Sequence, residues 1–469
     1  MAITRRQFIK RTGLAAAGSF IGPSLFRNPW LQQALAQTIG DRYFVVVFLD
    51  GGNDGLNTVT PIANGGTGNL RSAYQQARKS GVGGIQLSAA ELAATAIGND
   101  PSTGTPLALH PGLLGLKQLY DLNKVAVIQG CGYPDYSLSH DISRHSWQSG
   151  IPGGTGTGWM GRYLAANYAG TDIPAVNVTN EIAGEFIQST TSVLAIRRVG
   201  NFKFPYDQYD DSDIPAKSAA FQSLCTNAGA SAQPTLQYVG DAGSATLSAT
   251  SSYPPLSRQY QTDRSSFNQQ YTDLNTGFAR DLREVAKIIY GVNSGVLDVN
   301  ARFFELRNGG YDTHSDQGGG AAGGQHYSLH QEVGDALNLF YQDCLDMGVA
   351  NKLCIVTWSE FARRIEQNDN GTDHGSQGPM FVIGGAVNGG VYGNHPNINS
   401  AALNDDGNTM YSQAAGDPYR STDFRDVYGT LLKNWLNMPQ GTILSSVLTP
   451  DVGSPGSYWT APNFDLGFI

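Results

Sequence analysis

The sequence predicts an α/β fold with a doubly wound, mostly parallel sheet flanked by helices. The run from Tyr43 to Leu49 is continuously apolar and has the length of a strand, which suits a strand covered on both faces. Further runs of this kind alternate along the chain with amphipathic helical patterns, an alternation typical of doubly wound sheets. The 469 residues are long enough for a large buried core.

The individual elements follow from these two patterns. The expected strands are Tyr43–Leu49, Lys124–Gln129, Ala175–Thr179, Arg302–Leu306, Leu353–Trp358 and Met380–Ile383. The expected helices are Phe278–Tyr290, His326–Met347 and a shorter one that opens near Ser137 and continues through Trp147. The segment 206–266 is rich in Ser, Ala, Gly, Tyr and Pro and has weak periodicity. It is expected to be an insertion or lid over the working edge of the sheet, or a long ordered loop.

Residues 1–36 have the pattern of a twin-arginine (Tat) export signal. Arg5 and Arg6 precede Phe8 and Lys10, a moderately apolar stretch follows, and Ala34-Leu35-Ala36 offers a cleavage site before Gln37. An ordinary basic helix start is the alternative. We therefore expect the Tat machinery as a partner, a periplasmic or extracellular location and a mature α/β domain over 37–469. No later apolar run is long enough for a membrane span.

The charge balance argues against nucleic acid as a partner. The chain has 39 acidic and 30 basic residues, and five of the bases lie in the first 36 residues. Phosphate backbones require clustered cations, which such a chain lacks. The four cysteines fit no metal-binding spacing, and Cys344 and Cys354 are expected to be buried thiols.

Reactive residues gather where the predicted strands end. Asp50 begins a Gly-rich turn after the first strand, Asp312 and His314 follow a later one, and Asp373-His374 lies between glycines. Carboxyl ends of strands are the usual binding edge of such sheets. Asp and His ligands suit zinc or manganese, and converging carboxylates need a cation to neutralise their repulsion. The flanking glycines are expected to turn the backbone sharply and keep the site open.

Each of these residues also has a purely structural interpretation. Asp50 could only cap a turn, Asp312 and His314 could form a strand-end turn, and Asp373-His374 could be a surface pair. Glu360 and Arg363 are catalytic candidates or a structural ion pair at a helix start. His326 and His330 have metal-binding spacing on a helix, but an exposed polar face is the preferred interpretation, and His110 is expected to be structural.

Ser137 and Ser139 are the candidate nucleophiles. Either serine could simply cap the helix that follows. A hydroxyl at a helix N-terminus also lies where backbone N–H groups favour an anionic oxygen, and metal coordination would lower its pKa.

The ordered motifs together resemble one bacterial family. A Tat signal followed by FLDGGNDGLNT, YPDYSLSH, GGYDTH, SEFARR and GTDHG resembles the exported "fifteen-oh-one" domain of unknown function. That family is similar to the alkaline phosphatase and sulfatase superfamily.

The resemblance implies a hydrolase with one or two divalent ions, zinc first, with manganese or calcium as alternatives. Asp50, Asp373 and His374 would hold one ion, Asp312 and His314 the other, and Ser139 or Ser137 would attack phosphorus or sulfur. In this chain the intermediate His follows its Asp after two positions instead of four, and His395 is the histidine that follows the Asp-His pair. The Cys-x-Pro-x-Arg nucleophile motif of sulfatases is absent.

The sequence therefore predicts an exported metal-dependent hydrolase of phosphate or sulfate esters. Arg363 or Arg144 would hold the anionic group of a small-molecule or glycan ester. A non-catalytic member that binds or assembles in the cell envelope is the alternative. A metal-free serine hydrolase is disfavoured because no Gly-x-Ser-x-Gly elbow surrounds Ser137 or Ser139.

Overall fold

The computed structural model starts at Arg42 and describes most of the chain after it. The positions after Arg42 that it does not describe are 67, 155, 169–172, 189–190, 205–211, 298, 321–322, 397, 399–415, 419, 450–458 and 460. The predicted export signal and its cleavage site, 1–36, lie outside the described residues. None of the helices described from Arg42 onward is both long enough and apolar enough to span a bilayer.

The predicted first strand forms the centre of the main sheet. Every residue of β1 (Tyr43–Asp50) is buried. β1 pairs in parallel with β8 (Phe303–Gly309) on one side and with β9 (Leu353–Trp358) on the other. The three strands therefore end at the same edge, which brings Asp50 opposite Gly309.

The main sheet has nine described strands and is mostly parallel, as the sequence predicts. Its order is β13 (Gly390–Tyr392), β5 (Val125–Gly132), β12 (Gly378–Gly384), β9, β1, β8, β6 (Ala175–Asn177) and β7 (Val193–Ala195), with β14 (Thr422–Asp423) also paired to β5. Among these described strands, β12 alone is antiparallel to its neighbours. The start of β12 therefore lies at the edge where β1, β8 and β9 end.

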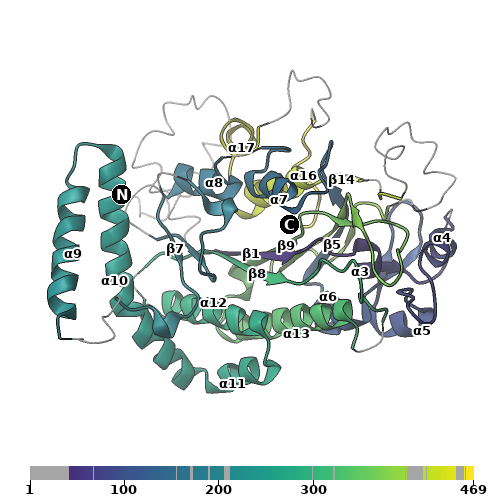
Figure 1. The fold of residues 1–469 in the computed structure, drawn as a ribbon, viewed down its shortest axis with the longest axis horizontal. Coiled ribbons are helices and arrows are strands. Elements are labelled where there is room, and N and C mark those ends of the chain that lie inside the picture. The colour runs from purple at the N-terminus through teal and green to yellow at the C-terminus, as the bar shows by residue number, and fades with distance from the viewer. Residues whose placement is uncertain are drawn as a thin grey trace, which may run out of the picture. The chain divides into compact units, whose positions relative to one another are not determined.

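Helices cover both faces of this sheet, which confirms the doubly wound class (Figure 1). One layer contains α6 (Leu114–Asp121), α12 (Gly277–Ser294) and α13 (Gln325–Asp346). The other contains α7 (His140–Ser149), α8 (Trp159–Asn167), α16 (Phe424–Thr430) and α17 (Gln440–Ser446).

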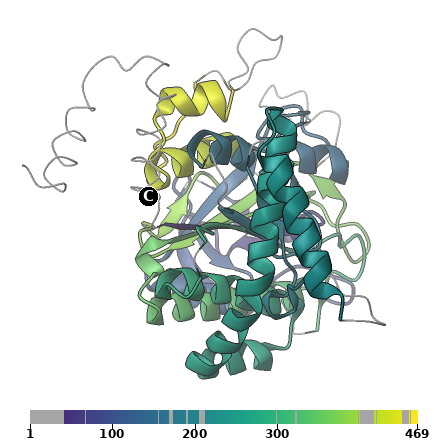
Figure 2. The ribbon, with the colours of Figure 1, turned by 90° about the vertical axis from the view of Figure 1, so that its left-hand side faces the viewer.

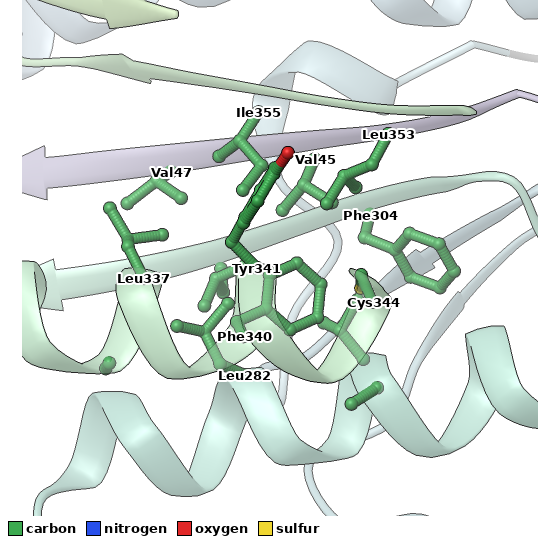
Figure 3. Packing of buried hydrophobic residues seen from close by; sticks show 14 of the residues in the cluster. Val45, Val47, Leu282, Phe304, Leu337, Phe340, Tyr341, Cys344, Leu353 and Ile355 are labelled. Carbon is green, nitrogen blue, oxygen red and sulfur yellow. The ribbon is translucent and has the colours of Figure 1, made fainter. Parts of the chain in front are cut away.

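Successive residues of β1 pack against the two helix layers in turn. Val45 and Val47 pack on Leu337 and Phe340 of α13 (Figure 3), whereas Phe44, Val46 and Phe48 belong to the core on the other face of the sheet. Full burial of one such side chain stabilises the fold by about 1.5–3 kcal/mol. This explains why the strand is apolar at every position.

The segment 206–266 is helical where it is described, so the interpretation as a long loop is wrong. It contributes α9 (Ile214–Gly229), α10 (Pro234–Asp263) and the start of α11 (Ser265–Leu274). α9 and α10 lie side by side (Figures 1 and 2). In α9 only Cys225 is buried among the described residues, so the helix has little need of an apolar face and shows weak periodicity. Its role as a lid stays a prediction.

The remaining elements are short. They are α3 (Gly55–Thr58), α4 (Leu70–Ala77), α5 (Ala89–Leu92), a sheet of β2 (Val59–Pro61), β4 (Pro106–Leu109) and β3 (Ala96–Asn99), and the antiparallel pair β10 (Ala362–Arg363) and β11 (His374–Gly375). Cys344 and Cys354 are buried free thiols, as predicted.

A buried ion pair fixes the turn after β1, and its removal should be costly. Arg78 and Asp54 have fully buried side chains and share two hydrogen bonds of 2.7 and 3.0 Å. We expect Arg78→Ala to lower the free energy of unfolding by about 3–5 kcal/mol, because it leaves a buried carboxylate unpaired. Urea unfolding measures this. Lys117→Ala, which breaks an exposed pair with Asp121, is the control and should cost less than about 1 kcal/mol. Equal losses in the two variants would contradict the expectation.

Candidate metal centre

Several loops meet at the edge where β1, β5, β8 and β9 end and β12 begins. They are the loops after β1, β5 and β8 and the connection from β9 to β12, which contains β10 and β11. The antiparallel pairing of β10 with β11 sets Arg363 opposite His374. Loops that are far apart in the sequence therefore present their polar residues to one another.

Glycines let these loops pack together instead of keeping the site open. Gly51 has a φ of +121°, and a Cβ there would lie 2.4 Å from the backbone nitrogen of Asp312. A Cβ on Gly371 would lie 2.4 Å from the carbonyl carbon of His314. Both positions require glycine because the neighbouring loop passes too close for any side chain.

Three of the predicted ligands converge at this edge. Asp312 Oδ1 lies 3.1 Å from His314 Nε2 and 3.2 Å from His374 Nε2, and the two Nε2 atoms are 2.9 Å apart. Ligands bound tetrahedrally to zinc at about 2.0–2.1 Å would be separated by about 3.3 Å. The donor types and their spacing thus fit a site for a divalent metal ion.

His140 joins the same cluster and was not predicted as a ligand. Its Nε2 is 3.5 Å from Asp312 Oδ2. Among the described residues, His140, Asp312 and His374 form a group whose donor atoms lie close enough together to hold one ion. The sequence marks His140 only by its place directly after the predicted helix cap at Ser139.

The Nδ1 atoms of all three imidazoles face oxygen acceptors. His140 Nδ1 is 2.7 Å from buried Glu360, His374 Nδ1 is 2.7 Å from the Leu138 carbonyl, and His314 Nδ1 is 3.3 Å from Asp373. Such contacts fix the tautomer and leave Nε2 free to bind metal. Asp373 and Glu360 thus orient histidines.

Glu360 and Arg363 are both buried but do not form the ion pair considered from the sequence. Glu360 accepts hydrogen bonds from the backbone N–H groups of Gly51 and Gly52, at 3.0 and 3.2 Å. Arg363 donates to Asp312 at 2.8 Å. Burial alone would raise the pKa of Asp312, but the hydrogen bonds from Arg363 and His374 lower it to about 2. The carboxylate is therefore ionised at neutral pH.

Two predicted ligands, Asp373 and Asp50, are not among the converging donors: Asp373 contacts His314 Nδ1 instead, and Asp50 faces arginines. The Asp50 carboxylate accepts a hydrogen bond from Arg144 at 3.0 Å and another from Arg307. In the described part of the chain its side chain has no hydrogen bond or ion pair with Asp373 or His374. Two guanidinium groups, instead of an ion, neutralise this carboxylate.

The candidate nucleophiles lie beside the cluster without touching its ligands. Ser139 is exposed at the N-cap of α7, and its side chain makes no capping hydrogen bond. The Ser137 hydroxyl accepts from the Ser139 backbone N–H at 3.1 Å. Leu138, between them, contacts His374 through its carbonyl. An accessible hydroxyl at a helix N-terminus is what the sequence predicts, and its reactivity stays a prediction.

His326 and His330 are buried, so their interpretation as an exposed polar face is wrong. Their rings contact each other and that of His110 in tilted and edge-on arrangements. They also contact the segment after β1, where His326 Nε2 is 3.0 Å from Asn53 Oδ1 and His330 Nε2 is 3.0 Å from the Thr58 hydroxyl. α13 presents this face to the turn after β1 instead of to solvent, which the i, i+4 spacing alone does not reveal.

His395 is also buried, and its contacts lie elsewhere. Its Nδ1 is 2.9 Å from the Pro396 carbonyl, and its Nε2 is 3.3 Å from the Val59 carbonyl. Among the described residues it has no contact with the metal cluster, so it does not complete the second ligand set that the superfamily resemblance implies.

Comparisons with known proteins identify a family but no activity. The model described as "Protein of unknown function (DUF1501)" matches residues 124–422, a segment that holds His140, Asp312, His314 and His374. No curated protein matches the chain. Among solved structures, PsFucS1 sulfatase from Pseudoalteromonas sp. is 12% identical to this chain, with a TM-score of 0.32. That match covers 90% of this chain and 74% of the sulfatase chain. The lipoteichoic acid synthase LtaP from Listeria monocytogenes is 11% identical, with a TM-score of 0.26, and its match covers 84% of this chain and 81% of the LtaP chain.

The buried histidines should make the fold sensitive to acid. Burial lowers the pKa of His110 to about 3 and lowers those of His326 and His330 well below 6.5. Below about pH 6.5 these histidines bind protons in the unfolded chain but stay neutral in the folded chain. The free energy of unfolding therefore falls by about 1.4 kcal/mol for each histidine and each pH unit that the pH is lowered.

Urea unfolding between pH 7.5 and 5, with a chelator present, measures this slope. His330→Gln should make the slope shallower by about one proton. Gln331→Ala, an exposed neutral position on the same helix, should leave it unchanged. A slope that is the same in both variants would show that His330 takes up its proton without unfolding.

Proposed function

Because this chain belongs to the family described as "Protein of unknown function (DUF1501)", its activity must be argued from its own site, and we propose that it is an exported, metal-dependent hydrolase of phosphate or sulfate esters. The observation that carries the proposal is the orientation of three imidazoles. His140, His314 and His374 each contact an oxygen through Nδ1 and point Nε2 at the carboxylate of Asp312.

Without an ion, an imidazole can contact the Asp312 carboxylate favourably only when its Nε2 carries a proton, as in the hydrogen bond from His374. The Nε2 atoms of His314 and His374 are 2.9 Å apart, and two N–H groups at that distance would repel each other. A divalent ion among these residues would take the place of the protons. Imidazole nitrogens with a carboxylate oxygen suit zinc best, with manganese as an alternative and calcium, which prefers oxygen ligands, less well matched.

The ion would supply Lewis acidity toward an ester oxygen and lower the pKa of a nearby hydroxyl. The chain's own residues have separate tasks. Buried Arg363 holds Asp312 in place, and Glu360 holds His140. Ser139, exposed at the N-terminus of α7, is the nucleophile that we favour over Ser137, since its hydroxyl has no hydrogen-bond partner among the described residues.

Export is part of the proposal. The twin-arginine segment points to the Tat machinery as a partner and to a periplasmic or extracellular location. The anionic ester, small molecule or glycan, would be met outside the cytoplasm.

A second candidate is a non-catalytic, metal-binding member that acts in envelope binding or assembly. Two observations favour it. Asp50 is bound by arginines, and neither candidate serine has a hydrogen bond to the cluster in the described part of the chain. Such a protein would bind zinc but hydrolyse no ester.

Metal content and hydrolysis test the two candidates together. We expect the zinc-loaded, desalted chain to retain at least one zinc ion, measured by elemental analysis. Asp312→Ala and His374→Ala should each weaken zinc binding at least tenfold, because each removes a ligand. Hydrolysis of 4-nitrophenyl phosphate or 4-nitrophenyl sulfate should disappear with chelator, return with zinc and fall strongly in Ser139→Ala.

The control is Asp316→Asn, an exposed position in the same loop whose side chain bonds only Asn370 among the described residues. It should retain zinc like the unaltered chain. Zinc without hydrolysis would favour the non-catalytic candidate. A chain that binds no zinc, or hydrolysis that survives Asp312→Ala, would overturn the proposed function.

A further inference from the structure

A cavity of about 720 Å³ lies beside the candidate metal centre. The same two segments supply residues to the cavity and to the metal centre. On α7, Arg144 of the cavity lies about one turn after His140 of the metal centre. In the segment of β8 and the loop after it, Arg307 of the cavity comes shortly before Asp312 of the metal centre. Asp50, at the end of β1, is bound by both arginines and so adjoins the cavity. We call this space the arginine cavity. Its size is in the range of pockets that bind small molecules.

Arg144 and Arg307 give the arginine cavity a local excess of positive charge. Two guanidinium groups share the single carboxylate of Asp50 and flank the Phe48 ring, at 5.5 and 5.8 Å from its centroid. The Arg307 side chain is 49% exposed and the Arg144 side chain 27%. Each guanidinium donates to Asp50 through Nη2, so further N–H groups of both arginines remain for an oxyanion.

The acidic residues of the lining do not cancel this charge. Asp281 is paired with Arg198 at 2.6 Å. The charge of exposed Glu181 is matched by that of Arg197, which also lines the cavity. Glu305 is 3% exposed and lies near buried Glu185. Burial, and then the nearby Glu185, raise the pKa of Glu305 well above its usual value, which disfavours the charged form of its carboxyl.

The rest of the lining suits a ring-sized body. Phe48, Val178 and the half-exposed Ile182 and Ile187 supply apolar surface. Gln148, Thr179 and Asn180 supply neutral polar groups. Apolar surface with a few polar groups and guanidinium donors matches a ring that carries hydroxyls and an anion.

We propose that the arginine cavity binds an oxyanion, a sulfate, phosphate or carboxylate, carried on a ring-sized polar body. Resting on the proposed function, this makes the substrate an ester with a second anionic group away from the bond that is cleaved. Arg307 and Arg144 select that group, and the metal centre holds the ester itself.

The test uses binding, so that it does not depend on hydrolysis. The full chain carrying Asp312→Ala is titrated by calorimetry with glucose 6-sulfate, glucose 6-phosphate and glucuronate, and with glucose as the uncharged match. At least one anionic sugar should bind tenfold or more tightly than glucose, and the three arms identify the oxyanion. Adding Arg307→Ala should weaken that binding about tenfold, the loss of one charge-assisted contact.

Two further variants separate binding from folding. In the same Asp312→Ala chain, Arg307→Lys keeps the charge without the planar fork, and its affinity should lie between that of Asp312→Ala alone and that of Asp312→Ala with Arg307→Ala. Arg258→Ala, an exposed arginine on α10 away from the cavity lining, should not change binding.

No preference for any anionic sugar, or the same loss in Arg258→Ala as in Arg307→Ala, overturns the assignment of the cavity. Anionic sugars that bind to a chain which hydrolyses no ester would leave the cavity standing while the proposed function fails.

Discussion

The buried guanidinium of Arg363 is the group on which the site depends. Its Nε donates to the Gly52 carbonyl at 2.7 Å, and its two Nη atoms reach the carbonyls of Thr372 and Tyr311 and the Asp312 carboxylate at 2.8–3.0 Å. The loops after β1 and β8 and the loop before β12 are thus bound to one cation. A buried arginine is tolerated only when nearly all of its donors are satisfied, so these loops have little freedom to separate.

The sheet could be predicted from the sequence because its strands are buried on both faces. Runs such as Tyr43–Leu49 and Leu353–Trp358 match β1 and β9 almost residue for residue. The direction of β12 could not be predicted, since a buried strand has the same composition in either direction. That direction explains why His374, which precedes a strand, meets Asp312, which follows one. The helices of 214–263 were missed because α9 is mostly exposed and leaves little apolar pattern, and because Pro254 and Pro255, which usually end helices, lie inside α10.

The candidate site was predictable in part for similar reasons. Asp312, His314 and His374 lie in Gly-flanked strand-end motifs, and they do meet. Asp50 has the same local pattern, but its partners, Arg144 and Arg307, lie 94 and 257 positions away, and only the fold pairs them. His140 lies at the start of a helix and not at the end of a strand. Looking for polar residues at strand ends therefore did not identify it as a ligand. Burial of His326 depends on packing of α13 against the turn after β1, which no local spacing encodes.

The charges of this chain would act on an anionic ligand differently at long range and at contact. With a net charge of −9, the chain as a whole repels an anion, but this repulsion is screened beyond about 8–10 Å at physiological salt. Within that distance the local groups decide. Arg144 and Arg307 outnumber Asp50, burial raises the pKa of the Glu305 carboxyl, and a divalent ion would reverse the charge of the Asp312 cluster. The edge of the sheet would therefore attract an anion at contact although the rest of the surface does not.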